Sequence, residues 1–335
     1  RMTSGALHPD IFERSERERP AFFLHPFVIA LHDASLWKRN TMNRVLRIGL
    51  TFLLLGASAG CMWKTPPPPQ AVKPPAKVAL VLGAGASRGF AHIGVLKILE
   101  SNRVPIHLIV GTSAGSLVGS MYAYGFNAFQ LQSLSFSVEK GDIIDLTVPD
   151  NGFIKGEKLE AYVNHMLKDT PIEKLRTPFY AVAADIQTGA EVVFATGNTG
   201  TAVRASCSIP GIFQPVRIGS RLYVDGGIVS PVAVDYARKM GADLVIAVDV
   251  SMGVESPPPK TLMETIMQSV VIMHSKIAQN QLSRADIVIR PRVSHIGSTD
   301  FTRRHEAVLE GEKAALEAMP QVKAALEKLK AEGRL

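Results

Sequence analysis

The residue with the clearest chemical potential is a serine held between glycines. Ser113 is the centre of Gly111-Thr112-Ser113-Ala114-Gly115, which follows the predicted strand His107–Val110 and precedes the predicted helix Ala114–Tyr124. A strand, a GxSxG turn and a helix in this order form the nucleophile elbow of serine hydrolases. We therefore interpret Ser113 as a nucleophile. The alternative is a packing turn, whose glycines only let neighbouring elements approach.

A second glycine-rich loop precedes the first. Gly83-Ala84-Gly85-Ala86-Ser87-Arg88-Gly89 follows the predicted strand Val78–Leu82 and leads into a predicted helix, Gly89–Glu100. A dinucleotide site would need glycine at the Arg88 position and an acidic residue about 20 positions further on. The next strand ends in Val110-Gly111-Thr112 instead, which disfavours nucleotide binding. Because N–H groups at a helix N-terminus bind anions, the loop favours an oxyanion site.

A serine nucleophile needs a base, and the sequence offers two kinds. Asp225, in Tyr223-Val224-Asp225-Gly226-Gly227, follows a short predicted strand, and the adjoining glycines leave its carboxylate free. On this segment alone, a hairpin turn explains the Asp-Gly pair equally well. An ordinary Ser-His-Asp hydrolase would use a histidine after the serine. The candidates are His165, His274, His295 and His305, and none of them has distinctive neighbours in the sequence.

In their order and spacing, these three segments resemble the patatin-like phospholipases. Further similar stretches are Gly89–Leu96, Ile154–Gly156, Val203–Ser206 and Ile209–Phe213. The resemblance covers roughly Val78–Ala247. It implies an α/β fold, a three-layer sandwich with a mostly parallel central sheet and a nucleophile elbow. This family is similar in fold to cytosolic phospholipase A2 and uses a Ser-Asp dyad.

Carried to this sequence, the resemblance implies Ser113 as nucleophile and Asp225 as base. It implies an oxyanion hole from Gly85, Ala86, Ser87 and Arg88. The supporting motif glycines are Gly83, Gly89, Gly111, Gly115, Gly226 and Gly227. Ala84 and Ala86 stand where many members have glycine. Alanine can donate its N–H comfortably there only if its φ is ordinary.

The folded part alternates strands and helices, which predicts a parallel or mostly parallel sheet covered on both faces. Besides the elements above, the predicted strands are Phe179–Ala184, Glu191–Phe194, Leu244–Val250 and Ile287–Arg290. The other predicted helices are Glu157–Lys168, Val232–Met240 and Leu262–Leu282, then Glu306–Met319 and Gln321–Ala331 with Pro320 dividing them.

The N-terminal quarter has the order of an export signal. Arg44 and Arg47 precede the apolar run Ile48–Ala57, and Ser58-Ala59-Gly60-Cys61 follows. The run is shorter than the roughly 20 residues that span a bilayer. Small residues before Cys61 resemble the lipobox of bacterial lipoproteins, with Ser58 where leucine is commoner. The alternative is a buried hydrophobic helix that contains Cys61.

These patterns divide the chain into five parts. We expect an upstream extension that is non-native or disordered (1–41), a lipoprotein-type signal peptide (42–60) and a proline-rich linker (61–77). A patatin-like catalytic domain (78–247) and a C-terminal helical region that completes or extends it (248–335) follow. A lipid anchor at Cys61 would place the protein in a bacterial cell envelope, at the periplasmic face of a membrane.

Composition restricts the partners. The formal net charge of +7 comes without a basic run, zinc-ligand spacing or aromatic-basic alternation, which disfavours nucleic acid. We expect no metal and no cofactor, and the oligomeric state stays open. The expected function is lipid acyl hydrolysis, of phospholipase A or carboxylesterase type, in lipid catabolism or membrane lipid remodelling. The alternatives are a Ser-His-Asp esterase or thioesterase, and a non-catalytic membrane-anchored binding protein on the same fold.

Overall fold

A computed structural model describes residues 73–148, 151–253 and 258–335. The predicted extension, signal peptide and lipidated Cys61 lie outside these residues and stay predictions. The described residues belong to one compact unit, which also takes in the region after residue 247.

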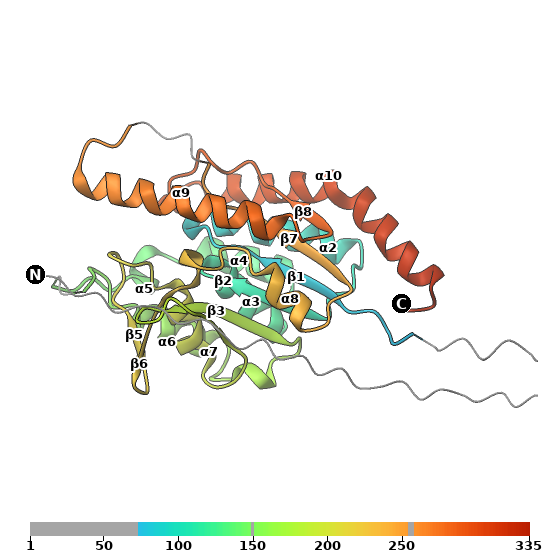
Figure 1. Ribbon diagram of the computed structural model, residues 1–335, viewed down its shortest axis with the longest axis horizontal. Helices are drawn as coiled ribbons and strands as arrows, with labels where there is room; N and C mark the ends of the chain where they lie inside the picture. The colour runs from blue at the N-terminus through green and yellow to red at the C-terminus, as the bar shows by residue number, and fades with distance from the viewer. Residues whose placement is uncertain (1–72, 149–150, 254–257) are drawn as a thin grey trace, which may run out of the picture. The chain divides into compact units, whose positions relative to one another are not determined.

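The centre of the fold is an eight-stranded sheet (Figure 1). Strands β3, β2, β1, β7 and β8 pair in parallel, while β4, β5 and β6 pair antiparallel. This confirms the mostly parallel α/β fold. The strands are β1 (Val78–Leu82), β2 (Leu108–Thr112), β3 (Phe179–Asp185), β4 (Glu191–Phe194), β5 (Val216–Ile218), β6 (Arg221–Asp225), β7 (Leu244–Val248) and β8 (Ile287–Ile289).

Helices cover both faces of the sheet. The side chains of β1 alternate between two cores: Leu80 and Leu82 pack with α2, α3 and α10, whereas Ala79 and Val81 pack with α8 and α9. This is the period of two that a strand buried on both faces requires. The helices are α2 (Phe90–Ser101), α3 (Ala114–Tyr124), α4 (Ala128–Ser137), α5 (Lys140–Ile143), α6 (Glu157–Met166), α7 (Thr199–Cys207), α8 (Val234–Lys239), α9 (Leu262–Leu282) and α10 (Arg304–Ala331).

Strand β3 brings the ends of two other strands together. Residues 181–184 of β3 pair with β4 along one edge. Residues 181 and 182 also pair with β2, and residues 183 and 184 also pair with β6, so β2 and β6 share the opposite edge of β3. Thr112, the last residue of β2, pairs with Val182, and Asp225, the last residue of β6, pairs with Ala183. Because β2 and β6 run in opposite directions, their final residues meet. The sheet itself therefore places the elbow beside Asp225.

The prediction of two terminal helices was wrong. Pro320 lies inside α10, which continues unbroken from Arg304 to Ala331. A proline removes one backbone hydrogen bond and normally breaks a helix. Here Met319 and Val322, on either side of it, are buried in the same core as α2. Tertiary packing therefore carries the helix past the proline.

Helices α4 and α7 were not predicted. Their sequences are short and rich in small or polar residues, which gives a weak helical period. Each nevertheless begins at an asparagine whose side chain accepts a hydrogen bond from the first turn, Asn127 in α4 and Asn198 in α7. These N-caps were the available sequence signals.

Helices α2 and α10 lie in direct backbone contact. A side chain at Gly94 of α2 would overlap the carbonyl of Val308, and one at Gly311 of α10 would overlap the carbonyl of Ala91. The two glycines therefore let the helices approach closely and seal one face of the sheet.

We predict that Gly311→Ala lowers the free energy of unfolding by ~1–3 kcal/mol, because its methyl group would force the two helices apart. Urea denaturation measures the change. Gly141→Ala is the matched control, since a Cβ there would meet no atom within 4 Å. Equal stability of both variants and the wild type would contradict this account of the helix contact.

Candidate active site

Ser113 occupies a strained elbow between β2 and α3. Its φ of 55° and ψ of −123° are unusual for a residue with a side chain. A Cβ at Gly111 would lie 2.5 Å from the carbonyl oxygen of Gly115, and one at Gly115 would overlap the carbonyl of Leu82. The glycines on either side are thus required by close backbone approach. The structure confirms the strand, turn and helix around Ser113.

The elbow is fixed by a buried serine that the sequence analysis did not single out. Ser206 of α7 accepts the N–H of Ser113 at 2.9 Å and donates its own hydroxyl to the Val182 carbonyl at 2.6 Å. Ser116 donates to the Ser113 carbonyl at 2.7 Å. Ser206 therefore ties the elbow to β3, the strand that also positions Asp225.

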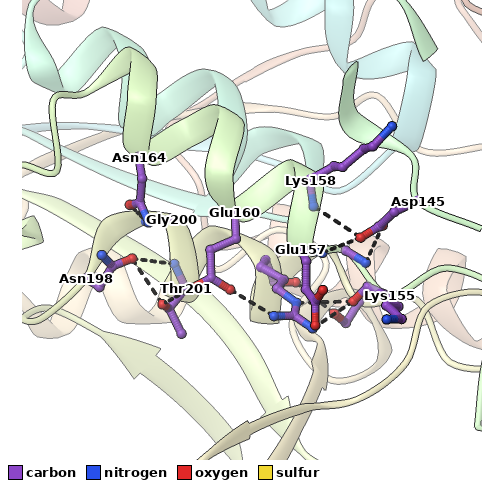
Figure 2. A network of polar contacts seen from close by, with 12 residues as sticks. Asp145, Lys155, Glu157, Lys158, Glu160, Asn164, Asn198, Gly200 and Thr201 are labelled. Atoms are coloured by element: carbon purple, nitrogen blue, oxygen red, sulfur yellow. Dashed lines mark hydrogen bonds and ion pairs between the residues drawn. The ribbon is translucent and has the colours of Figure 1, made fainter. Parts of the chain in front are cut away.

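A polar network holds α7 against α6 (Figure 2). Arg204 donates to Glu160 at 2.9 Å and to the Lys155 carbonyl at 2.8 Å, and the N–H of Gly200 donates to Asn164 at 3.0 Å. Asp145 accepts three backbone N–H groups at the start of α6. The network immobilises the helix that carries Ser206.

Asp225 is buried at the end of β6. Its Oδ1 accepts the N–H of Gly227 at 2.7 Å, and its own N–H donates to the Ser208 carbonyl at 2.8 Å. Burial raises the pKa of Asp225 to about 6, while the Ser113 hydroxyl and the Gly227 N–H act in the opposite direction. The buried carboxylate thus lies in a site that favours taking up a proton.

In the glycine loop, most N–H groups are already engaged. Those of Gly83, Ala84, Ser87 and Arg88 donate to loop or strand carbonyls. Within the described residues, no partner is seen for the N–H groups of Gly85 and Ala86. These two are therefore the donors that remain for an anion.

The side chains of Arg88 and Ser87 anchor this loop. The Arg88 guanidinium donates to the carbonyls of Val250 and Ile296, both at 3.1 Å, and burial lowers its pKa to about 10. The Ser87 hydroxyl donates to the Gly297 carbonyl at 2.6 Å. Both side chains fasten the loop to the segments after β7 and β8.

Ala86 has a φ of 51°, in the left-handed region, whereas Ala84 does not have a positive φ. A side chain costs roughly 1–2 kcal/mol in that region. Ala86 is therefore held in a conformation that glycine would adopt freely.

Two cavities meet at Ser113. The smaller has a volume of about 210 Å³ and is lined almost entirely by apolar side chains from α3, α4, α6 and the segment 207–213. The larger has a volume of about 620 Å³ and is lined by α9, the glycine loop and Asp225. Ser113 and Ala86 line both. A molecule bound across Ser113 would thus place one part on an apolar side and another beside the carboxylate.

Of the late histidines, one reaches this site. His274 of α9 lines the larger cavity, and a Cβ at Gly227 would lie 3.7 Å from its Cδ2. Burial lowers the pKa of His274 to about 4, and its buried Nε2 has no hydrogen-bond partner within the described residues. The others lie elsewhere: His165 is exposed, His295 contacts Glu306 and His305 stacks on Phe136.

Cys207 also lines the smaller cavity, where burial raises the pKa of its thiol. Within residues 73–148, 151–253 and 258–335, no group of His, Cys, Asp or Glu is arranged to hold a metal ion. None of the helices in these ranges is long and apolar enough to span a membrane.

Residues 80–238, which contain the elbow, the glycine loop and Asp225, match the family described as "Patatin-like phospholipase". The chain carries a domain of the patatin-like phospholipase family. It is 36% identical over 181 residues to the mouse protein "Patatin-like phospholipase domain-containing protein 6", an alignment that covers 52% of this chain and 13% of that protein. It is 31% identical over 278 residues to "Uncharacterized NTE family protein MT2641" of Mycobacterium tuberculosis, covering 73% of this chain and 47% of the relative.

The chain therefore spans about half or less of the length of these relatives, 47% of one and 13% of the other. Among solved structures, it is similar to VipD from Legionella pneumophila, with 14% identity and a TM-score of 0.43 over 75% of this chain and 68% of that one.

We predict that Ser206→Ala lowers the free energy of unfolding by ~1–3 kcal/mol, because it leaves the buried N–H of Ser113 without an acceptor. Ser208→Ala is the matched control. That hydroxyl donates to the Arg204 carbonyl one helical turn away and holds no part of the elbow. Chemical denaturation of both variants measures the difference, and equal losses would exclude a special role for Ser206.

Proposed function

We propose that this chain is a serine lipid acyl hydrolase, of phospholipase A or carboxylesterase type. The observation that carries the proposal is Ser113 on a strained elbow, in one cavity with a buried carboxylate, Asp225, whose pKa is raised. Strained backbone and desolvated carboxylates both oppose folding and concentrate at catalytic sites. The relatives named as patatin-like phospholipases support the same reaction class.

The proposed reaction transfers an acyl group to water. Asp225 removes the proton of the Ser113 hydroxyl as its oxygen attacks the ester carbonyl carbon. The N–H groups of Gly85 and Ala86 stabilise the oxyanion of the tetrahedral intermediate. When the intermediate collapses, the carbon–oxygen bond to the alcohol breaks, and Asp225 returns the proton to the leaving oxygen. A water molecule, deprotonated by Asp225, then attacks the acyl carbon. The bond from this carbon to the Ser113 oxygen breaks, Asp225 returns the proton to Ser113, and the fatty acid is released.

The two cavities suggest how the ester lies. Asp225 lines the larger cavity and is absent from the lining of the smaller one. Since the leaving oxygen must receive its proton from Asp225, the alcohol portion belongs in the larger cavity. The apolar lining of the smaller cavity then suits the acyl chain.

One observation favours a Ser-His-Asp arrangement as a second candidate: His274 lies in the same cavity as Ser113 and Asp225. A histidine with a pKa of about 4 is a weak base at neutral pH, however. Ser113 and Asp225 line the same cavity, and the Ser113 hydroxyl acts to lower the pKa of Asp225. We therefore favour the Ser-Asp dyad.

Three substitutions separate these mechanisms. We predict that Ser113→Ala and Asp225→Asn each lower kcat for a soluble carboxylic ester by at least about 10³-fold, because each removes a group that takes part in bond or proton transfer. His274→Ala should retain kcat within about tenfold. A loss in His274→Ala as large as that in Asp225→Asn would refute the dyad. Wild-type protein without esterase activity would favour the non-catalytic binding protein.

The raised pKa of Asp225 predicts the pH dependence. As a base, Asp225 must be ionised, so kcat/KM should fall as the pH drops through about 6 and level off above it. A pH–rate profile of the wild type from pH 4 to 9 measures the midpoint, and circular dichroism at each pH verifies that the protein remains folded. A midpoint near 4, the ordinary value for aspartate, would show that burial does not tune this carboxylate.

A further inference from the structure

The N-terminal half of α9 lies at the surface of the protein. The helix is 21 residues long, and its charged residues are Glu264 and Lys276. Near its C-terminus, Ala278 and Leu282 are buried in the core with α8. Over 262–273, every residue whose burial the structure describes is half-buried or exposed. The first half of an apolar helix thus lies outside the core.

This half-helix has two apolar sides. One side covers the larger cavity, with Met267, Val271 and His274 among its lining residues. The other presents Leu262, Ile266 and Met273, which are 79%, 49% and 56% exposed. Their spacing places these three side chains in one stripe along the helix. The helix therefore covers the cavity and turns an apolar stripe outward.

A second apolar group lies on the segment after α5. Leu146, Val148 and Phe153 are 80%, 83% and 48% exposed. Leu146 forms a bridge with Ile154, which lines the smaller cavity. In Figure 1, α5 and the N-terminal half of α9 lie at the same end of the molecule. We call the exposed residues of both segments the apolar rim: Leu146, Val148, Phe153, Leu262, Ile266 and Met273.

We propose that the apolar rim docks the protein onto a lipid surface. The rim belongs to the two segments that line the cavities at Ser113, so a second protein copy seated there would obstruct them, whereas a lipid surface would present substrate to them. The docking proposal rests on the proposed function, in which the substrate is a lipid. Exposed apolar side chains gain free energy by entering the acyl region of a bilayer.

Charge near the stripe suits anionic headgroups. Lys260 and Lys276 are exposed beside it. The carboxylate of Glu264 accepts the N–H groups of Lys260 and Thr261, at 2.6 Å and 3.1 Å, so helix capping already engages this negative charge. Lysines at a membrane surface are attracted to anionic lipids.

The test is flotation of the full chain with vesicles of phosphatidylcholine and phosphatidylglycerol. All proteins carry Ser113→Ala to prevent hydrolysis and Cys61→Ser to remove the predicted lipid attachment. Leu262→Ser, Ile266→Ser and Met273→Ser combined should lower the vesicle partition coefficient by at least about tenfold. Leu309→Ser with Leu316→Ser is the matched control, since these leucines are 48% and 56% exposed on α10, a helix that carries no rim residue.

With Ser113 intact, the triple variant should hydrolyse a soluble short-chain ester like the wild type and lose activity on vesicles. Unchanged partition of the triple variant would overturn the proposal. If the wild type is a dimer and the triple variant is a monomer with an unchanged vesicle partition coefficient, the rim binds a second copy of the chain instead. If the wild type binds vesicles through the rim but hydrolyses no ester, the proposed function fails and the docking surface stands.

Discussion

The pairing of β3 with both β2 and β6 along a single edge is the constraint on which the candidate site depends. Val182 and Ala183 are consecutive, and each pairs with the last residue of a different strand. The nucleophile elbow and the carboxylate are therefore brought together by backbone hydrogen bonds in the interior of a sheet, where positions are defined more closely than in loops. Ser206 extends this control, because its hydroxyl joins the Ser113 N–H to the Val182 carbonyl.

Several features of the site oppose folding. Ser113 and Ala86 hold positive φ angles, and Asp225 is a buried carboxylate. The rest of the domain compensates by rigid anchoring: Arg88 and Ser87 fasten the glycine loop, and the network around Arg204 and Asp145 fixes α7. Such strain persists only where surrounding contacts determine the backbone, and its place at one site is the expected signature of function.

The sequence predicts what is local and leaves open what depends on distant contacts. The elbow at Ser113 could be predicted because strand, glycines and helix are adjacent in the chain. For Asp225, the segment alone could not decide between base and hairpin turn, since its position is set by pairing with β3. Ser206 was not singled out because its two hydrogen bonds reach distant segments. Pro320 was misjudged because the packing of α10 against α2 outweighs a local helix-breaking signal.

The central claim, that Asp225 activates Ser113 for acyl transfer, is tested most directly by trapping the nucleophile. The folded protein is treated with a fluorophosphonate, and the adduct is located by peptide mass spectrometry. The account predicts a single adduct on Ser113, formed at least about 100-fold more slowly in Asp225→Asn. An adduct on another residue, or equal rates in the two proteins, would contradict it.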